Sequence, residues 1–539
     1  MKRNLLKLFL PVLVLALASC VGKTDKVAAD SRTISTSVLK DKIAGGWAGK
    51  MLGVTYGAPT EFKAKGKTFE DSIKWVPSDV KGSIWQDDIY VQLSFLMAMD
   101  KYGIDAPAKK FQEIFAKAGF QLWHANVQAR KNYYDSIFPP QSGHPDYNLH
   151  ADDIDFQIEA DYIGFMCPGM PQTANKIADK IGHIMNYGDG VYGGVFVGAL
   201  YSEAYFENDI PKIIDKALLS IPAESDYSKI VKDVIVLHKQ YPNDWRAAWA
   251  ELEAKWGTVQ ICEAGTTFNI DAKLNGAFIV MGLLYGDGDP AKTLDITTRC
   301  GQDSDCNPSN AMALLGVIKG FNGLPAEYQT AVKAIGDSVF VNTTYSFNKA
   351  VDKTMEYAQK LVVDNGGKVT SDELTIKVQA SQPFALEVAF PKLVFDHQVS
   401  VFEKAGWEFK GEWKTYQQDG KYDQAKFSSN KGDEATFNFE GTGVSIVGNW
   451  FKDGGKADVF VDGELKRTID CYFDFANQTH MGMNLYHIFN LPQGKHSVKV
   501  VVKGEKRPEG SAANIYLSKA VVFKTADKKN ENYKFSFQK

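Results

Sequence analysis

The chain has 539 residues, of which 44% are hydrophobic and 23% are charged, and its formal net charge is −4. A chain of this length and composition is expected to form two or three globular domains, which excludes wholesale disorder and fibrous repeats. The slight acidity argues against a nucleic-acid partner, and six cysteines are too few for a disulfide-dense scaffold.

The N-terminal segment predicts export and a lipid anchor. A basic start precedes an apolar run, and a Leu-Ala-Ser sequence leads directly into Cys20. Small residues just before a cysteine are typical of bacterial lipoprotein signals, in which that cysteine is acylated and becomes the new N-terminus. We therefore expect a signal peptide over residues 1–19, lipidation at Cys20 and a linker over residues 20–35. A plain secretory signal is the alternative.

These features predict a lipoprotein of the cell envelope. We expect it at the outer membrane, facing the periplasm or the cell surface. No other apolar stretch is long enough to cross a bilayer, so the lipid anchor would be the only contact with the membrane.

Residues 36–365 have the periodicity of helices. In one segment Ile89, Leu93 and Leu96 recur on one face, as helical spacing requires. Glycines recur every four residues in two other segments, at Gly45, Gly49 and Gly53 and at Gly190, Gly194 and Gly198. Such stripes let a second helix approach closely. We predict a compact all-α domain over this range.

Residues 391–539 alternate with a period of two instead. Phe437 and Phe439 alternate with polar residues, and Asp462-Gly463 between two alternating runs is a strong hairpin signal. Short strands with Gly-rich turns are typical of antiparallel sandwiches. We predict a β-sandwich that folds on its own, joined to the helical domain by a connector over residues 366–390.

Carboxylates gather at three places in the helical part. Glu61 lies in a loop after a glycine-rich helix, Asp87 and Asp88 open a helix, and Asp303 and Asp305 precede another helix. Because like charges repel, a site that gathers carboxylates is usually neutralised by a hard cation. Helix capping also favours Asp at such positions, but it explains the three places together less well than it explains each one alone.

The helical part resembles the ADP-ribosylglycohydrolases, the family that includes the dinitrogenase-reductase-activating glycohydrolase. The resemblance runs from about Thr36 to Leu324 and rests on Lys42-Ile43-Ala44-Gly45-Gly46-Trp47-Ala48-Gly49, Gly57-Ala58-Pro59-Thr60-Glu61-Phe62, Asp87-Asp88 and Gly301-Gln302-Asp303-Ser304-Asp305. It implies an all-α fold, two magnesium ions in a cleft, and hydrolysis of an N- or O-glycosidic bond to ribose.

The resemblance also implies roles for the carboxylates. Asp87, Asp88, Asp303 and Asp305 would be metal ligands, and Glu61 would orient or activate water near the scissile bond. On this basis Glu61, Asp87 and Asp303 are the predicted catalytic residues.

Two positions depart from the family pattern. Gln86 and Cys306 stand where the family usually has threonines that supply oxygen to the metals. Gln86 still offers a carbonyl oxygen and is predicted as a ligand, whereas a thiol is a poor ligand for Mg²⁺. We therefore expect one of the two metal sites to be weak, and Mn²⁺ is an alternative to Mg²⁺.

Two further segments are predicted to contact substrate. Asp152 and Asp155, with Glu159, would share one face of a helix, and Tyr187 and Tyr192 flank a glycine-rich loop that feeds another helix. Glycosidases use a pair of carboxyl groups, and tyrosines line sugar subsites. The alternatives are an acidic helix start in solvent and ordinary core packing.

The C-terminal part resembles the galactose-binding-type β-sandwich modules of bacterial carbohydrate enzymes. The resemblance rests on Gly441-Thr442-Gly443-Val444-Ser445-Ile446-Val447-Gly448, Val461-Asp462-Gly463 and Leu491-Pro492-Gln493-Gly494-Lys495-His496. It implies sugar contacts through exposed aromatic side chains, with Trp450 and Tyr472 as candidates; a purely structural module is the alternative.

Together these observations predict a metal-dependent hydrolase that cleaves a glycosidic bond of an extracytoplasmic glycan or glycoside. Fold alone does not fix the substrate, so the location of the enzyme matters. A lipid-tethered enzyme with such a module meets glycans, whereas ADP-ribosylated proteins are mainly cytoplasmic. The alternatives are removal of ADP-ribose from a protein or small molecule, and a glycan-binding lipoprotein without activity.

Overall fold

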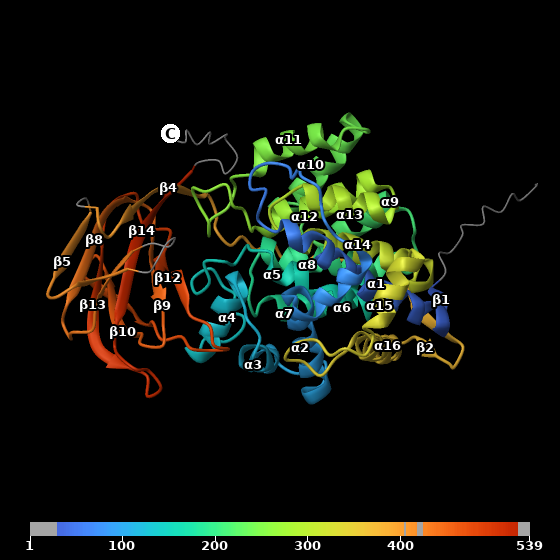
Figure 1. Ribbon diagram of the computed structural model, residues 1–539, viewed down its shortest axis with the longest axis horizontal. Helices are drawn as coiled ribbons and strands as arrows, with labels where there is room; N and C mark the ends of the chain where they lie inside the picture. Colours follow the sequence, from blue (N-terminus) through green and yellow to red (C-terminus); the bar gives the residue numbers. More distant parts are fainter. Residues whose placement is uncertain (1–29, 404–405, 418–423, 527–539) are drawn as a thin grey trace, which may run out of the picture.

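A computed structural model describes residues 30–403, 406–417 and 424–526. The predicted signal peptide, Cys20, the first part of the predicted linker and residues 527–539 lie outside the described residues. Within them, the chain forms a helical body and a β-sheet body that adjoin each other (Figure 1). This confirms the predicted fold class, a helical domain followed by antiparallel β-sheets.

The helical domain consists mostly of short and medium-length helices, and in two of the longer ones at most one residue is not buried. The helices are α1 (Thr36–Gly57), α2 (Asp87–Tyr102), α3 (Ala108–Lys117), α4 (His124–Tyr134), α5 (Asp155–Glu159), α6 (Asp161–Phe165), α7 (Pro171–Gly182), α8 (Asp189–Ala204), α9 (Ile210–Ala217), α10 (Asp226–Gln240), α11 (Trp245–Trp256), α12 (Ala272–Gly286), α13 (Pro290–Arg299), α14 (Cys306–Lys319), α15 (Ala326–Ala334) and α16 (Phe347–Asp364). The two buried ones are α8 and α12, so they form the centre of the domain.

The glycine stripe of α1 packs directly against α14, as its spacing predicts. A Cβ atom on Gly49 would lie 2.3 Å from the carbonyl oxygen of Met312, and one on Gly53 would lie 2.2 Å from that of Pro308. The approach continues past the helix end, because a Cβ on Gly57 would lie 2.0 Å from the carbonyl oxygen of Ser304. The pairing therefore brings the loop after α1 beside the loop before α14.

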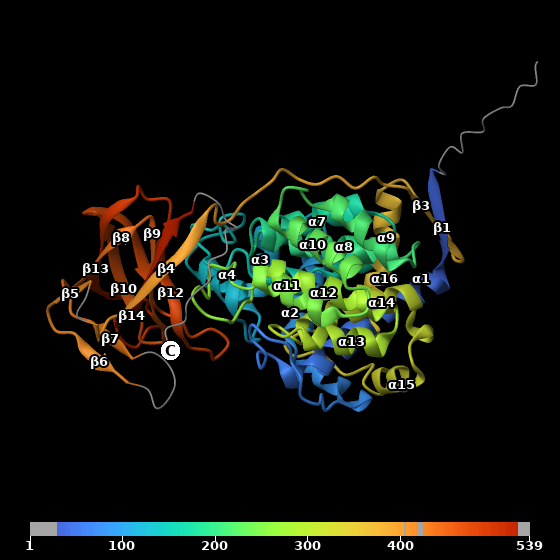
Figure 2. The same ribbon diagram turned by 90° about the horizontal axis from the view of Figure 1, so that it is seen from above.

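A small sheet closes the far end of the helical domain. Strand β1 (Ser31–Ser35) pairs antiparallel with β3 (Glu373–Lys377), which also pairs with β2 (Lys368–Val369). The predicted linker and the predicted connector thus both contribute strands to the helical domain. After β3 the chain runs extended along the helices to the β-sheet body (Figure 2).

The C-terminal domain has two antiparallel sheets. Its strands are β4 (Leu393–Ser400), β5 (Trp407–Lys410), β6 (Lys414–Tyr416), β7 (Ala425–Ser428), β8 (Glu434–Gly441), β9 (Gly443–Trp450), β10 (Gly455–Val461), β11 (Glu464–Asp470), β12 (His480–Ile488), β13 (Gly494–Lys506) and β14 (Ile515–Thr525). One sheet has the order β11-β10-β13-β8-β5, and the other has the order β12-β9-β14-β7-β6 with β4 also on β14.

The alternating pattern of the sequence is reproduced in these strands. Phe437 and Phe439 of β8 are both buried, and Asp462 and Gly463 form the predicted turn between β10 and β11 with φ angles of 51° and 83°. Two consecutive residues with positive φ are what a tight two-residue hairpin turn requires.

The sandwich is docked onto the helical domain by specific contacts. The ring of Phe475 stacks on Tyr134 of α4 with a centroid separation of 3.7 Å. The side chain of Gln478 accepts a hydrogen bond from the backbone of Leu122 and donates one back to it, and His487 Nε2 lies 2.5 Å from the carbonyl oxygen of Pro145. The segment before β12 therefore lies against the last residue of α4, through Phe475, and against the residues just before this helix, through Gln478.

The burial of two aromatic side chains decides whether they are exposed, as the predicted sugar contacts require. Trp450 and Tyr472 are only 3% and 6% exposed, so the expectation that they are exposed aromatics for sugar contacts is wrong. Trp450 stacks on Phe473, with ring centroids 5.8 Å apart. Within the described part of the chain, none of the helices combines the length and apolar character needed to span a membrane.

Candidate active site

The three carboxylate segments of the helical domain meet around one cavity of about 200 Å³. Glu61 comes from the loop after α1, Asp87 from the first turn of α2, and Asp303 and Asp305 from the loop before α14. The close pairing of α1 with α14 explains why residues so far apart in sequence converge. Gln86 also lines the cavity, whereas Asp88 is fully buried behind it.

One group of carboxylates has the donor set of a hard-cation site. Glu61, Asp303 and Asp305 each offer a carboxylate oxygen, and the three oxygens lie within 4.8 Å of one another. Asp305 Oδ1 is buried without a hydrogen-bond partner among the described residues. An unpaired buried carboxylate oxygen is costly, and Mg²⁺ and Mn²⁺ prefer such ligands, so these residues fit a divalent cation.

The environment of Asp88 fits a second cation less well. Lys50 Nζ donates to Asp88 Oδ1 over 3.1 Å, and the Cys306 thiol donates to Asp88 Oδ2 over 3.0 Å. Lys50 is fully buried and also lies 2.9 Å from Asp161 Oδ2. Despite that burial, the carboxylates of Asp161 and Asp88 raise the pKa of Lys50. An internal ammonium group therefore already neutralises the carboxylate that a second cation would need.

The cavity carboxyl groups take up protons readily when no cation is bound. Burial, followed by the charges of Asp88 and Glu61, raises the pKa of Asp87 to about 7. Burial also raises the pKa of Asp303 to about 8, with Glu61 and Asp88 adding to it. The pKa of Glu61, whose side chain keeps contact with solvent, is raised by partial desolvation and by the charge of Asp88. Carboxyl groups with such pKa values can donate and accept protons near neutral pH.

Asp155 completes one wall of the cavity. Its carboxylate accepts hydrogen bonds from the backbone amides of Ala125 and Asn126 over 3.2 and 2.9 Å, so it is fixed at the N-terminus of α4. Burial and the neighbouring Asp153 raise its pKa to about 7. The structure thus brings this predicted substrate residue to the same cavity as the predicted catalytic residues.

Asp152 lies elsewhere, and the predicted helix face that it shares with Asp155 is wrong. Helix α5 begins only at Asp155, because the residues before it form a turn that is bridged through Asp153 to Asp271, just before α12. The backbone carbonyl of Asp152 accepts a hydrogen bond from Ala272, and its carboxylate lies 3.2 Å from Lys273 Nζ. Asp152 is therefore part of a buried ion-pair cluster outside the cavity.

Tyr187 and Tyr192 also do not line the carboxylate cavity. The Tyr192 hydroxyl donates to the carbonyl oxygen of Ala385 over 3.1 Å and accepts from the amide of Glu387 over 2.6 Å. Tyr187 packs edge-on against His144, with centroids 4.9 Å apart. Tyr192 therefore anchors the extended segment that joins the two domains, and a substrate contact for either tyrosine stays a prediction.

Two tryptophans at the cavity were not assigned from the sequence. Trp85 and Trp123 line it and are 65% and 44% exposed, which is unusual for such large apolar side chains. Trp85 directly precedes Gln86 and the Asp-Asp pair, and Trp123 directly precedes α4. Sequence position alone does not distinguish an exposed tryptophan from a core one, and this is why they were missed.

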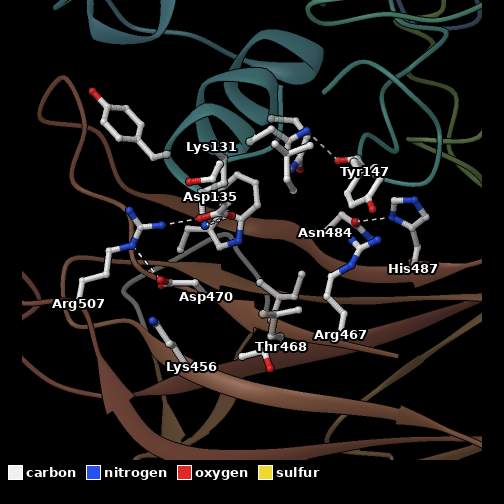
Figure 3. Close-up of a pocket in the computed structure, with 18 of the residues that line it drawn as sticks. Lys131, Asp135, Tyr147, Lys456, Arg467, Thr468, Asp470, Asn484, His487 and Arg507 are labelled. Carbon is white, nitrogen blue, oxygen red and sulfur yellow. Dashed lines mark hydrogen bonds and ion pairs between the residues drawn. The ribbon is translucent and has the colours of Figure 1, made fainter. Parts of the chain in front are cut away.

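A larger cavity of about 670 Å³ lies between the two domains, bounded by α4 on one side and by strands β10, β11 and β12 on the other (Figure 3). Most of the charged side chains around it are paired. Arg507 bridges Asp135 and Asp470, the second contact at 2.8 Å, and Lys131 lies 2.6 Å from Asp135. Arg467 packs over the Tyr147 ring. These contacts identify it as part of the domain interface, and the carboxylate cavity as the candidate active site.

Comparisons with known proteins agree with this assignment. A family model described as ADP-ribosylglycohydrolase matches residues 35–362. A stretch of 79 residues is 29% identical to the A type blood alpha-D-galactosamine galactosaminidase of Flavonifractor plautii and covers 15% of this chain but only 7% of that protein.

Two solved structures share parts of the chain at low similarity. An ADP-ribosylglycohydrolase-related protein complex is 12% identical, with 60% of this chain and 98% of that chain covered and a TM-score of 0.41. The CBM36-1 domain of a multidomain xylanase from the hindgut metagenome of Trinervitermes trinervoides is 14% identical, with 24% and 100% covered and a TM-score of 0.18. Both TM-scores are too low to carry an argument.

Proposed function

The chain belongs to the ADP-ribosylglycohydrolase family, a family of metal-dependent hydrolases, and on that premise we propose that it hydrolyses a glycosidic bond of an extracytoplasmic glycan or glycoside. The observation that carries the proposal is the cavity around which the carboxyl groups meet, and the exposed Trp85 and Trp123 at its rim support a substrate with a ring. Exposed aromatic rings beside a polar cavity offer an apolar face on which a sugar ring can stack.

The size of the cavity supports a small reacting group. Its volume of about 200 Å³ lies below the range of about 300–1,000 Å³ that is typical of sites for drug-sized ligands. It therefore suits a single terminal sugar better than an internal stretch of a polysaccharide. The partial similarity to a protein named as a galactosaminidase agrees with glycoside chemistry.

The proposed mechanism assigns a role to each carboxyl group. Glu61, Asp303 and Asp305 would hold Mg²⁺ or Mn²⁺, which when bound supplies Lewis-acid polarisation of water or of a sugar hydroxyl. Asp87, with its pKa raised to about 7, gives a proton to the departing oxygen or takes one back at neutral pH. Asp155, held by the amides of α4, presents its carboxylate to positive charge that develops at the anomeric carbon.

The test is turnover of a panel of aryl glycosides by the full mature chain, with and without Mg²⁺ and Mn²⁺. We expect cation-dependent release of the aryl group from at least one glycoside. Asp87→Asn should lower kcat by about 10²–10⁴-fold, as removal of a positioned acid or base does, while it keeps the same overall fold. Absence of turnover with every glycoside and every cation would contradict the proposal.

The cation site has a separate readout. Added Mg²⁺ should raise the melting temperature of the wild type, because a ligand that binds only the folded state stabilises it. Asp303→Asn should abolish that rise without loss of helical signal in circular dichroism, since Asp303 lies in the loop before α14. An equal rise in both proteins would show that Asp303 is not a ligand.

Removal of ADP-ribose from a protein or small molecule is the second candidate, because the family match supports it. The same tryptophans could stack on adenine, so ADP-ribosyl-arginine belongs in the panel. Cleavage of that compound alone would favour this candidate. Binding of glycans without any turnover would instead indicate the third candidate, a glycan-binding lipoprotein.

We also propose that the protein is a lipoprotein anchored to the cell envelope through Cys20, on the basis of the Leu-Ala-Ser-Cys sequence. The wild type should then partition with membranes in a bacterial host, and Cys20→Ser should release it. Recovery of an unacylated wild-type protein in the soluble fraction would refute the anchor.

A further inference from the structure

A second group of ligand-type side chains lies beside the carboxylate cavity. His124, His150 and Asp153 each offer one ligand atom, and these atoms lie within 4.8 Å of one another. His124 is the first residue of α4 and also lines the carboxylate cavity, whereas His150 and Asp153 lie in the segment that leads into α5. The group therefore joins two segments at the wall of the cavity and does not overlap with Glu61, Asp303 and Asp305.

The contacts within this group centre on the carboxylate of Asp153. His150 Nδ1 lies 2.7 Å from Asp153 Oδ2, and His124 Nδ1 lies 3.7 Å from the same oxygen. The two imidazole rings meet edge to face, with centroids 5.7 Å apart. On the other side, the Cys262 thiol donates to Asp153 Oδ1 over 3.0 Å. Two imidazoles and a carboxylate thus converge, with a thiol next to them.

The backbone holds these side chains in place. His124 has a φ of 41°, a left-handed conformation that is uncommon for a residue other than glycine, and the two amides that follow it are fixed by Asp155. The backbone amide of His150 donates to Asn148 Oδ1 over 3.0 Å, and that of Asp153 donates to the carbonyl oxygen of His150 over 2.9 Å. The site is therefore preorganised before any ligand binds.

The donor chemistry differs from that of the carboxylate cavity. Imidazole nitrogen is a preferred ligand of Zn²⁺ and other late first-row transition metals, whereas Mg²⁺ selects oxygen. Three protein ligands of the His-His-carboxylate kind, with a fourth position left open, are the arrangement of catalytic zinc sites.

We propose that His124, His150 and Asp153 bind a transition-metal dication of the Zn²⁺ class, with an open coordination position toward the carboxylate cavity. The open position follows from the placement of His124 in the wall of that cavity. The ion would stand beside the substrate, at a place distinct from the oxygen site of Asp303 and Asp305. This inference concerns metal binding alone, so it does not depend on which glycosidic bond the protein cleaves.

Co²⁺ titration tests the proposal, because its visible absorption reports nitrogen and oxygen ligands directly. The full mature chain, without an affinity tag and stripped with EDTA, is titrated with Co²⁺ and, by calorimetry, with Zn²⁺. We expect one tight equivalent in the wild type. His150→Ala should weaken that binding at least about 100-fold, since loss of one ligand of three removes a large part of the affinity. Wild-type protein that binds neither ion would overturn the proposal.

Two further variants keep the result interpretable. His124→Asn suits the left-handed backbone of that position and should also weaken Co²⁺ binding. His183→Ala is the matched control. His183 Nε2 also pairs with a carboxylate, 3.0 Å from Glu387 Oε2, but this pair includes no other histidine. This variant should bind Co²⁺ as the wild type does. If the His124 and His150 variants bound Co²⁺ as tightly as the wild type does, the assignment of these ligands would be contradicted.

The two metal sites are separated by a crossed comparison. Asp303→Asn should keep the Co²⁺ absorption but lose the rise in melting temperature with Mg²⁺, and His150→Ala should do the reverse. Loss of both responses in the Asp303 variant would show that Co²⁺ enters the oxygen site, which would overturn the separate histidine site.

Discussion

The two domains differ most in what they bury. The helical domain encloses many charged side chains, among them Lys50, Asp88, Asp161, Asp303 and Asp305. In the described part of the sandwich, the buried polar side chains are those of serine, threonine, asparagine, glutamine and one histidine, and none of them belongs to Asp, Glu, Lys or Arg. The sandwich core is instead built from alternating valine, phenylalanine and isoleucine on facing sheets.

This difference separates a region built for chemistry from one built for stability. Burial of a charge is unfavourable unless the charge is paired, so a core that gathers carboxylates gives up stability for reactivity. In the helical domain several of these charges surround one cavity, and Lys50 neutralises the buried carboxylates of Asp88 and Asp161 beside it. The sandwich contributes instead through its contacts with Leu122, which directly precedes the cavity residue Trp123, and with Tyr134 at the other end of α4.

Removal of Lys50 is expected to have the largest effect on stability, and it tests the difference between the two domains directly. Lys50→Met leaves the carboxylates of Asp88 and Asp161 buried without their cation, so we expect the free energy of unfolding to fall by about 3–5 kcal/mol. Denaturant titration measures this. Lys466→Met is the control in the sandwich, where the exposed pair with Glu464 contributes about 0–1 kcal/mol. Equal effects in both variants would contradict the contrast between the domains.

The glycine stripe of α1 gives the next largest effect. Gly49→Ala places a Cβ 2.3 Å from the backbone of Met312, so we expect a loss of about 1–3 kcal/mol as α1 and α14 move apart. Gly198→Ala in α8 is the matched control, because its Cβ would meet no atom closer than 3.9 Å. There the better helix propensity of alanine should raise stability by about 0.4–1 kcal/mol. Thermal unfolding measures whether the two substitutions change stability in opposite directions.

The docking of the sandwich is tested at Phe475. Phe475→Ala removes the stack on Tyr134 and should weaken the interface by about 1–2 kcal/mol. In calorimetry the melting of the sandwich should then separate from that of the helical domain, and circular dichroism should show that its strands persist. Phe402→Ala, at a position 40% exposed, should leave the transitions unchanged. A variant in which both domains unfold together at a lower temperature would contradict an independently folding sandwich.

The smallest effect concerns a buried acid outside the cavity. Burial raises the pKa of Glu253 in α11 to about 7 from its usual 4.5. A raised carboxyl pKa means that the folded state holds a proton which the unfolded state releases, so stability is lost as the pH rises from 4.5 to 7. Glu253→Gln should therefore stabilise the protein by about 1 kcal/mol at pH 8 and change nothing near pH 4. Glu224→Gln at an exposed position should show no such pH dependence.

Much of the architecture could be predicted because it depends on local patterns. A spacing of three and four residues specifies helices, alternation specifies strands, and Asp462-Gly463 specifies a turn, since each reports the geometry of a few neighbouring residues. The four-residue spacing of Gly45, Gly49 and Gly53 even predicted a close helix contact. What the spacing did not state is that the partner is α14, whose preceding loop carries Asp303.

The candidate site was predicted in its parts rather than in its arrangement. The family resemblance pointed to Glu61, Asp87 and the Asp303 loop, but Asp152 was placed on a helix that begins only at Asp155. Tyr192, predicted to contact substrate, lies outside the carboxylate cavity, and its hydroxyl binds the segment between the domains. In both cases the partner found in the structure, Lys273 or Ala385, is far away in sequence.

Sequence by itself thus determined the two kinds of domain, the family and the set of carboxylates, because periodicity and motifs are carried by neighbouring residues. Only the tertiary structure decided which charges meet. It paired Lys50 with Asp88, exposed Trp85 and Trp123 at the cavity, and brought His124 to His150 and Asp153. The physical reason is that burial and electrostatic pairing act between groups within a few ångströms in space, whatever their separation along the chain.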